Sequence, residues 1–77
     1  MWEWTIEYRG DIITVKNKLS RAFLYLNGQE IDSQGGIFGG MLMGKTSFGD
    51  SIKVVLNSGF IKIHCSIYIN DERVFKN

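Results

Sequence analysis

The chain has 77 residues, of which 44% are apolar and 22% are charged, and this mixture favours one folded domain over residues 1–77. The net charge of +1 argues against a protein that neutralises nucleic-acid phosphates. No apolar run approaches the ~20 residues that cross a bilayer, and the start, MWEWTIE, lacks the features of a secretion signal. We therefore expect a cytoplasmic protein with no nucleic-acid or membrane partner.

Alternation of apolar and polar residues predicts four short strands in the first half of the chain. Residues 2–9 read WEWTIEYR, the pattern of a strand with one buried face. Gly10 and Asp11 turn the chain, and Asn27 followed by Gly28 is a strong hairpin signal because both residues tolerate positive φ. The strands predicted around these turns cover residues 2–9, 12–16, 22–26 and 29–32.

The clearest strand lies near the C-terminus, over residues 61–69. Its sequence, IKIHCSIYI, has isoleucine or cysteine at every second position, and β-branched residues at this density disfavour a helix. Residues 52–56 precede it across a turn at 57–59, and residues 73–75 follow it. No window of a dozen residues has the i, i+3, i+4 spacing of an amphipathic helix.

These patterns predict an antiparallel all-β fold, a small sandwich or barrel of seven to eight short strands. The core is expected on the apolar faces of the strands. Its predicted members include Trp4, Ile6, Leu24, Ile52, Val54, Ile61, Ile63, Cys65 and Ile67.

A weak internal repeat divides the chain into two units. Residues 10–15, GDIITV, resemble residues 49–54, GDSIKV, and residues 24–31, LYLNGQEI, resemble residues 67–74, IYINDERV. Two units of this kind, packed face to face, would bury each other's apolar sides. The alternative is that alternating strands resemble one another by chance.

A nucleotide-binding motif is matched in the glycine-rich middle of the chain. From Gly39 to Thr46 the sequence reads GGMLMGKT, which fits the phosphate-loop pattern G-x-x-x-x-G-K-[ST]. That loop works only between a strand and a helix, but turn residues and another predicted strand follow Thr46. We therefore expect no nucleotide. The glycines between 35 and 49 are interpreted as strand corners and close backbone approaches around short strands at residues 37–38 and 41–43, with a mobile ligand-covering loop as the alternative.

The residue types that carry most catalysis and metal binding are scarce. His64 and Cys65 are neighbours on a strand and therefore point to opposite faces, with Cys65 on the core side. There is no second histidine or cysteine to complete a metal site or a thiolate–imidazole pair. We expect no catalytic residue, no cofactor and no metal, and hence a protein that is not an enzyme.

Apolar residues exceed what one small core needs. Phe23 and Tyr25 alternate with core residues, and Met41 and Met43 flank Leu42 in the same way. Either these residues belong to central strands of a closed sandwich, or one face meets a partner. Phe23, Tyr25, Met41, Met43 and Tyr68 are the predicted partner-binding residues.

The chain also resembles a known family. Trp4 in the first strand, the hairpin LNGQEI over residues 26–31 and the motif YIND over residues 68–71 resemble the β-sandwich domains of the Fas apoptosis inhibitory molecule family. The likeness spans most of the chain, but Asp71 stands where that family has a glycine. It implies a compact, non-enzymatic all-β protein that acts through contacts with other proteins.

The expected function is therefore a non-enzymatic protein-interaction module that associates with itself or with a protein partner. The alternative is a β-barrel or sandwich that binds a small ligand or carbohydrate, with exposed aromatic residues such as Tyr25 and Tyr68 as stacking platforms.

Overall fold

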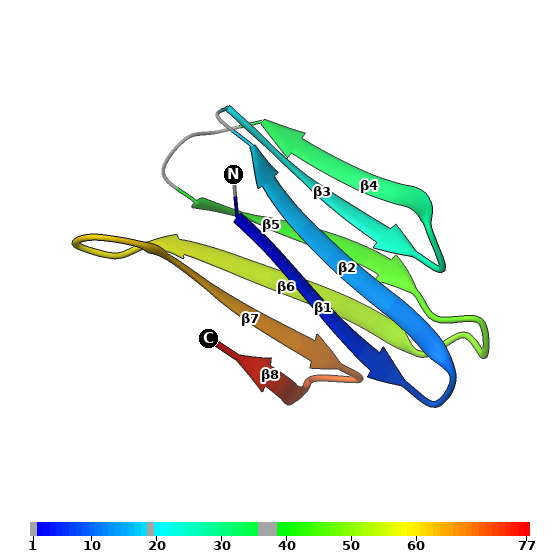
Figure 1. The fold of residues 1–77 in the computed structure, drawn as a ribbon. Coiled ribbons are helices and arrows are strands. Elements are labelled where there is room, and N and C mark those ends of the chain that lie inside the picture. Colours follow the sequence, from blue (N-terminus) through cyan, green and yellow to red (C-terminus); the bar gives the residue numbers. More distant parts are fainter. Residues whose placement is uncertain (1, 19, 36–38) are drawn as a thin grey trace.

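Two four-stranded antiparallel sheets, each a simple meander, pack against each other in the computed structural model (Figure 1). The structure describes residues 2–18, 20–35 and 39–77. The first sheet contains β1 (Trp2–Tyr8), β2 (Asp11–Lys18), β3 (Arg21–Leu26) and β4 (Gln29–Gly35). The second contains β5 (Gly39–Lys45), β6 (Ser51–Ser58), β7 (Ile63–Ile69) and β8 (Glu72–Lys76). The prediction of an antiparallel all-β fold, a small sandwich or barrel of seven to eight short strands, is confirmed, and the described residues form a sandwich of eight.

Three hairpins close through two-residue turns at the same end of the sandwich. Both central residues have positive φ in each: Arg9 and Gly10, Asn27 and Gly28, and Asn70 and Asp71. This is the type I′ geometry, whose twist matches that of the flanking strands. These turns therefore fix the register of the β1–β2, β3–β4 and β7–β8 pairs locally.

The two sheets are structural repeats of each other. In each unit the third strand pairs with the fourth across a bulge, between Leu24 and Tyr25 in one and between Ile67 and Tyr68 in the other. Asn27 donates its backbone N–H to Ile12 O and accepts the Ile12 N–H on Oδ1, both at 2.8 Å. Asn70 makes the same pair of bonds with Ser51, at 2.9 and 3.0 Å.

The core lies between the facing sides of the two sheets, as alternation predicts. Most residues expected in the core are buried or pack against it. The prediction for Ile61 is wrong, since its side chain is 85% exposed. β6 extends to Ser58 and β7 begins at Ile63, so Ile61 lies in the hairpin tip between them. Sequence reasoning also left out several buried residues: Ile13, Val15, Ala22, Leu42, Leu56 and Ile69.

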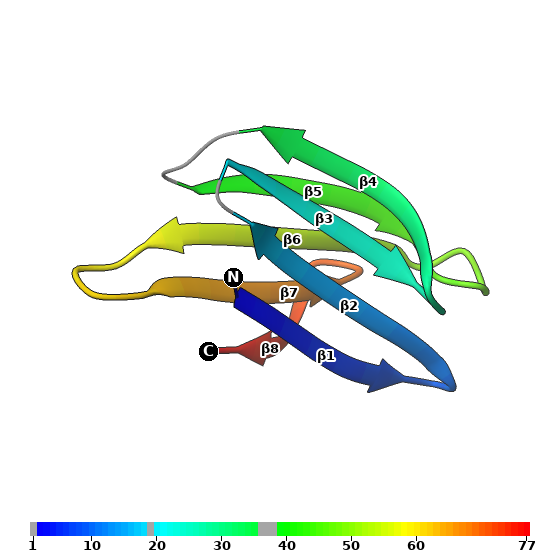
Figure 2. The same ribbon diagram turned by 45° about the horizontal axis from the view of Figure 1, so that its top comes forward.

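β4 and β5 are the neighbouring edges of the two sheets, and they contact each other (Figures 1 and 2). The Met43 N–H on β5 donates to Oδ2 of Asp32 on β4 at 2.8 Å. A Cβ at Gly44 would lie 2.5 Å from Cδ1 of Ile31, so the glycine is what lets β4 approach so closely. This is one of the close backbone approaches that the glycine-rich segment predicts.

The segment that matches the phosphate loop is almost entirely strand. Residues 39–45 form β5 and pair with β6 along their whole length. The hydroxyl of Thr46 accepts the backbone N–H groups of Phe48 and Asp50, at 3.3 and 3.0 Å, and so organises the β5–β6 loop. The strand–loop–helix arrangement of a phosphate site is not formed in the described part of the chain.

Two further expectations concern the ends of strands. The second strand, predicted over residues 12–16, also includes the polar residues Asn17 and Lys18, because β2 runs through Lys18. The short strand expected around residues 37 and 38 lies outside the described residues. Where the structure describes the chain, it contains no helix with the length and hydrophobicity needed to cross a bilayer.

Candidate interaction surfaces

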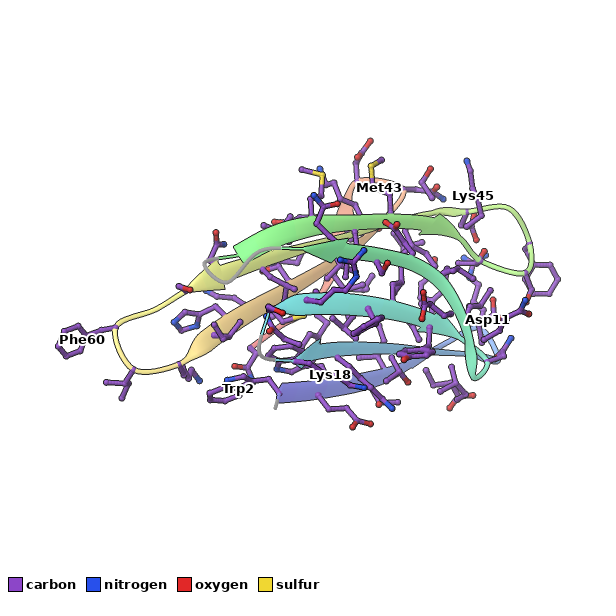
Figure 3. All side chains as sticks on the ribbon, turned by 90° about the horizontal axis from the view of Figure 1, so that it is seen from above. Trp2, Asp11, Lys18, Met43, Lys45 and Phe60 are labelled. Carbon is purple, nitrogen blue, oxygen red and sulfur yellow. The ribbon has the colours of Figure 1, made fainter. Side chains whose placement is uncertain are left out.

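The outer side of the second sheet carries an apolar surface centred on two methionines. Met41 and Met43 flank the buried Leu42 on β5, and their side chains are 48% and 58% exposed. The register places Val55 beside Met41, and Tyr68 lies two strands from Met43, across Lys53. We call Met41, Met43, Val55 and Tyr68 the methionine face. Figure 3 shows Met43 pointing away from the sandwich.

The outer side of the first sheet carries Phe23 and Tyr25. Their ring centroids are 6.3 Å apart, and the ring planes are tilted by 33°. The ammonium group of Lys16 lies 5.0 Å from the centroid of Tyr25, and that of Lys18 lies 5.3 Å from the centroid of Phe23. These are favourable cation–π arrangements, and both rings are half-buried.

The five predicted partner-binding residues therefore do not form one surface. Phe23 and Tyr25 lie on the outer side of the first sheet, whereas Met41, Met43 and Tyr68 lie on the outer side of the second. Figure 3 views the sandwich edge-on, with Met43 on one side and Lys18 on the other. Alternation in the sequence shows which residues of a strand share a face, but it does not show to which sheet that strand belongs.

Tyr25 and Tyr68, the suggested stacking platforms for a sugar, have similar surroundings. Lys53 lies 5.1 Å from the ring centroid of Tyr68, as Lys16 does at 5.0 Å from that of Tyr25. A lysine ammonium therefore approaches each ring where a sugar would stack. The methionines have no comparable cover, and we regard the methionine face as the better candidate for a contact surface.

Asp11 is the centre of a polar cluster at the end of the sandwich where the type I′ turns lie. Its carboxylate accepts the backbone N–H of Ser47 at 2.9 Å, the Ser47 hydroxyl at 2.5 Å and the Asn27 side-chain amide at 3.0 Å. These bonds hold the pKa of Asp11 below its usual value of 3.8, with the Ser47 hydroxyl contributing most and burial acting in the opposite direction. Ser47 belongs to the second sheet's β5–β6 loop, so this cluster ties the two sheets together.

Sequence reasoning treated Asp11 only as a turn residue. The signal that could have identified it is the repeat, in which Asp50 is its counterpart. Asn70 donates its side-chain amide to Asp50 at 2.9 Å, as Asn27 does to Asp11. Only Asp11 is additionally bonded to Ser47, because the five-residue β5–β6 loop reaches across to the other sheet.

The tip of the β6–β7 hairpin carries the most exposed apolar residues among those described. Phe60 is fully exposed, Ile61 is 85% exposed, and Figure 3 shows Phe60 at one extremity of the molecule. Phe48, in the β5–β6 loop, is also 77% exposed. The predicted strand begins at residue 61, two residues before β7, because Ile61 continues the alternation of the strand that follows it.

His64 and Cys65 lie on opposite sides of β7, as the sequence predicts. Cys65 is fully buried, and burial raises the pKa of its thiol to about 12, so the thiol stays protonated and unreactive. His64 is exposed, with Nδ1 at 3.2 Å from Asn77 O. No cluster of three or more His, Cys, Asp or Glu side chains suited to a metal ion occurs among the residues that the structure describes.

No known family, curated protein or solved structure was found to match the chain. The resemblance to the Fas apoptosis inhibitory molecule family depends on the residues quoted above and stays a prediction.

Proposed function

We propose that this protein is a non-enzymatic interaction module that associates with itself through the methionine face. The observation that carries the proposal is the exposure of Met41 and Met43, which project from one side of one strand beside Val55. Covering such side chains with a second copy removes apolar surface from water, which is favourable. Methionine also adapts its shape readily at interfaces.

The free edges of the sheets are less suited to self-association than this face. β4 and β8 each carry a bulge, and Asp32 already binds the Met43 N–H on β5. Two β1 strands paired around Thr5 would set Glu3 opposite Glu7, a repulsive arrangement. Bulges, charges and cover of this kind protect edges against pairing with another chain.

The size of the domain gives association a thermodynamic role. A 77-residue chain buries a limited core, and small domains often depend on a disulfide, a metal or an oligomeric contact. A two-fold contact would bury each methionine face against its copy. Our proposal places the protein in the cytoplasm, where Cys65 would remain a thiol.

Sedimentation equilibrium over micromolar concentrations tests the proposal. We expect a concentration-dependent mass between one and two chains. The double variant Met41→Gln, Met43→Gln keeps side chains of similar length but removes their apolar character. It should raise the dissociation constant at least about tenfold, since a tenfold change corresponds to about 1.4 kcal/mol and each buried methionine contributes a similar amount.

The matched control is Ile12→Thr, which lies on the outer side of the first sheet and is 41% exposed. It removes exposed apolar surface of comparable size and should leave the association unchanged. A single-chain mass for the wild-type protein at every concentration would contradict self-association. An equal loss in the control would show that the methionine face is not the contact.

A further inference from the structure

The two ends of the sandwich differ in charge. At one end β2 and β4 end, β3 and β5 begin, and the β6–β7 hairpin has its tip, while the other four connections lie at the opposite end (Figures 1 and 2). Counting each connection with its two flanking residues on either side, the first end has three basic residues and no acidic one: Lys18, Arg21 and Lys62. The other has six acidic and three basic residues: Glu7, Asp11, Glu30, Asp50, Asp71, Glu72, Arg9, Lys45 and Arg73.

The basic end also holds the exposed apolar tip, and the tip is a well-formed structure. Gly59 donates its N–H to Lys62 O at 2.6 Å, which leaves Phe60 and Ile61 as the two residues between them. A Cβ at Gly59 would lie 2.5 Å from Nε2 of His64, so the histidine ring packs directly against the base of the tip. The base of the tip is therefore held by this hydrogen bond and by the His64 ring, and the apolar pair projects from it.

Turn chemistry does not account for this pair. Turn positions favour Gly, Asn, Asp and Ser, and the type I′ turns of this chain follow that preference at every central residue except Arg9. Phe60 and Ile61 are almost fully in water, where they contribute nothing to the core. Trp2 lies at the same end, 41% exposed and stacked on the buried Trp4 at 6.3 Å between centroids.

We propose that the basic end docks on the surface of a lipid bilayer that contains anionic lipids. Phe60 and Ile61 enter the boundary between headgroups and acyl chains, as the apolar parts of interfacial proteins do. Trp2 lies at the headgroup level, which tryptophan prefers. Lys18, Arg21 and Lys62 attract the anionic headgroups, while the acidic end points away from the membrane.

A bilayer suits the shape of this end better than a protein partner does. Two consecutive residues at a narrow hairpin tip cannot provide the broad, flat area that a stable protein interface buries, but a fluid monolayer adapts to a convex tip. The sequence predicts no membrane partner because it has no long apolar run, and two apolar residues at a hairpin tip do not form one. Membrane docking does not depend on self-association, because the tip and the methionine face are separate surfaces.

Co-sedimentation of the full chain with vesicles tests the proposal. Wild-type protein should bind vesicles of phosphatidylcholine with phosphatidylglycerol, and bind much less to phosphatidylcholine alone. Phe60→Ser, Ile61→Ser should weaken binding at least about tenfold through the loss of apolar insertion. Lys62→Gln should weaken it about fivefold, and raising the salt from about 0.05 M to about 0.5 M should also weaken it.

The control is Phe48→Ser, which removes an exposed phenylalanine from the acidic end. It should bind as the wild type does, and circular dichroism should show that both serine variants keep the β-sheet. Absence of wild-type binding to the anionic vesicles would overturn the proposal and leave a pocket in a protein partner as the role of the tip. The proposal would also be overturned if the Phe60→Ser, Ile61→Ser variant bound as tightly as the wild type. It would likewise be overturned if Phe48→Ser lost as much binding as that double variant.

Discussion

The carboxylate of Asp11 is buried, and the fold surrounds it with hydrogen-bond donors. It is 5% exposed and accepts hydrogen bonds from Ser47 and Asn27, which come from two different turns. A buried charge is tolerated only where hydrogen bonds replace its water, and here the three bonds do so. Asp11, which the sequence shows only as part of the β1–β2 turn, thus also links the two sheets through its bonds to Ser47.

The pKa of Asp11 makes stability depend on pH. Because the pKa in the folded state lies below its usual value of 3.8, the carboxylate contributes stability that is complete above the unfolded-state pKa. This contribution is lost as the pH falls through the folded-state pKa. Urea unfolding should show that Asp11→Asn is less stable than the wild type at pH 6, and that the difference shrinks below about pH 4.

The control for this prediction is Asp71→Asn, a change in the exposed β7–β8 turn where positive φ suits asparagine. It should leave the acid limb of the stability curve close to that of the wild type. A difference between Asp11→Asn and the wild type that stayed constant from pH 6 to pH 3 would show that shape, and not charge, explains the effect.

At the scale of elements, the packing around β5 requires one of its inward-facing glycines and not the other. Gly40 and Gly44 both lie on the side of β5 that faces the first sheet, on either side of Leu42. A Cβ at Gly40 would meet Cγ of Gln34 at 3.5 Å, an ordinary contact. At Gly44 it would meet Cδ1 of Ile31 at 2.5 Å and Cδ2 of Leu24 at 3.5 Å, so only Gly44 is required by packing.

Gly44→Ala should therefore destabilise the protein by about 1–3 kcal/mol, the usual cost of overpacking. Ile31→Val removes the methyl group that the new Cβ would meet, so the cost of Gly44→Ala should be smaller in that background. Gly40→Ala should be neutral or slightly stabilising, because alanine restricts the unfolded chain. Denaturant unfolding of the four variants measures the coupling, and equal costs in both backgrounds would contradict the proposed contact.

The strands could be predicted from the sequence because one side of each sheet is buried, which imposes a period of two. The same period misassigned Ile61, since a hairpin tip of two apolar residues does not interrupt the alternation. Alternation also cannot show which sheet a face belongs to, so Phe23 and Met43 were grouped on one surface. The Asp11 cluster was out of reach because Ser47 lies 36 residues away along the chain.

At the scale of the whole molecule, neither sheet has a second layer of its own. Each unit has one apolar side, and the fully buried residues of both sides, such as Leu24 and Ile67, belong to a single cluster. Their positions correspond in the repeat, one residue before the bulge in each unit. A sheet with one apolar side needs another layer against which to bury it, so the two units should fold and unfold together.

The two tryptophans make this prediction testable, because both lie on β1 in the first sheet. Ile67→Ala, in the second sheet, should cost about 2–5 kcal/mol, a large share of the stability of a small domain. Tryptophan fluorescence and far-ultraviolet circular dichroism should report the same shifted urea midpoint, although the mutation is in the other sheet. Val74→Ala lies at the exposed bulge of β8. By either probe, it should change the free energy of unfolding by no more than about 0.5 kcal/mol. If Ile67→Ala moved the dichroism transition but left the fluorescence transition in place, the first sheet would be stable without the second, and the shared core would not be what holds it.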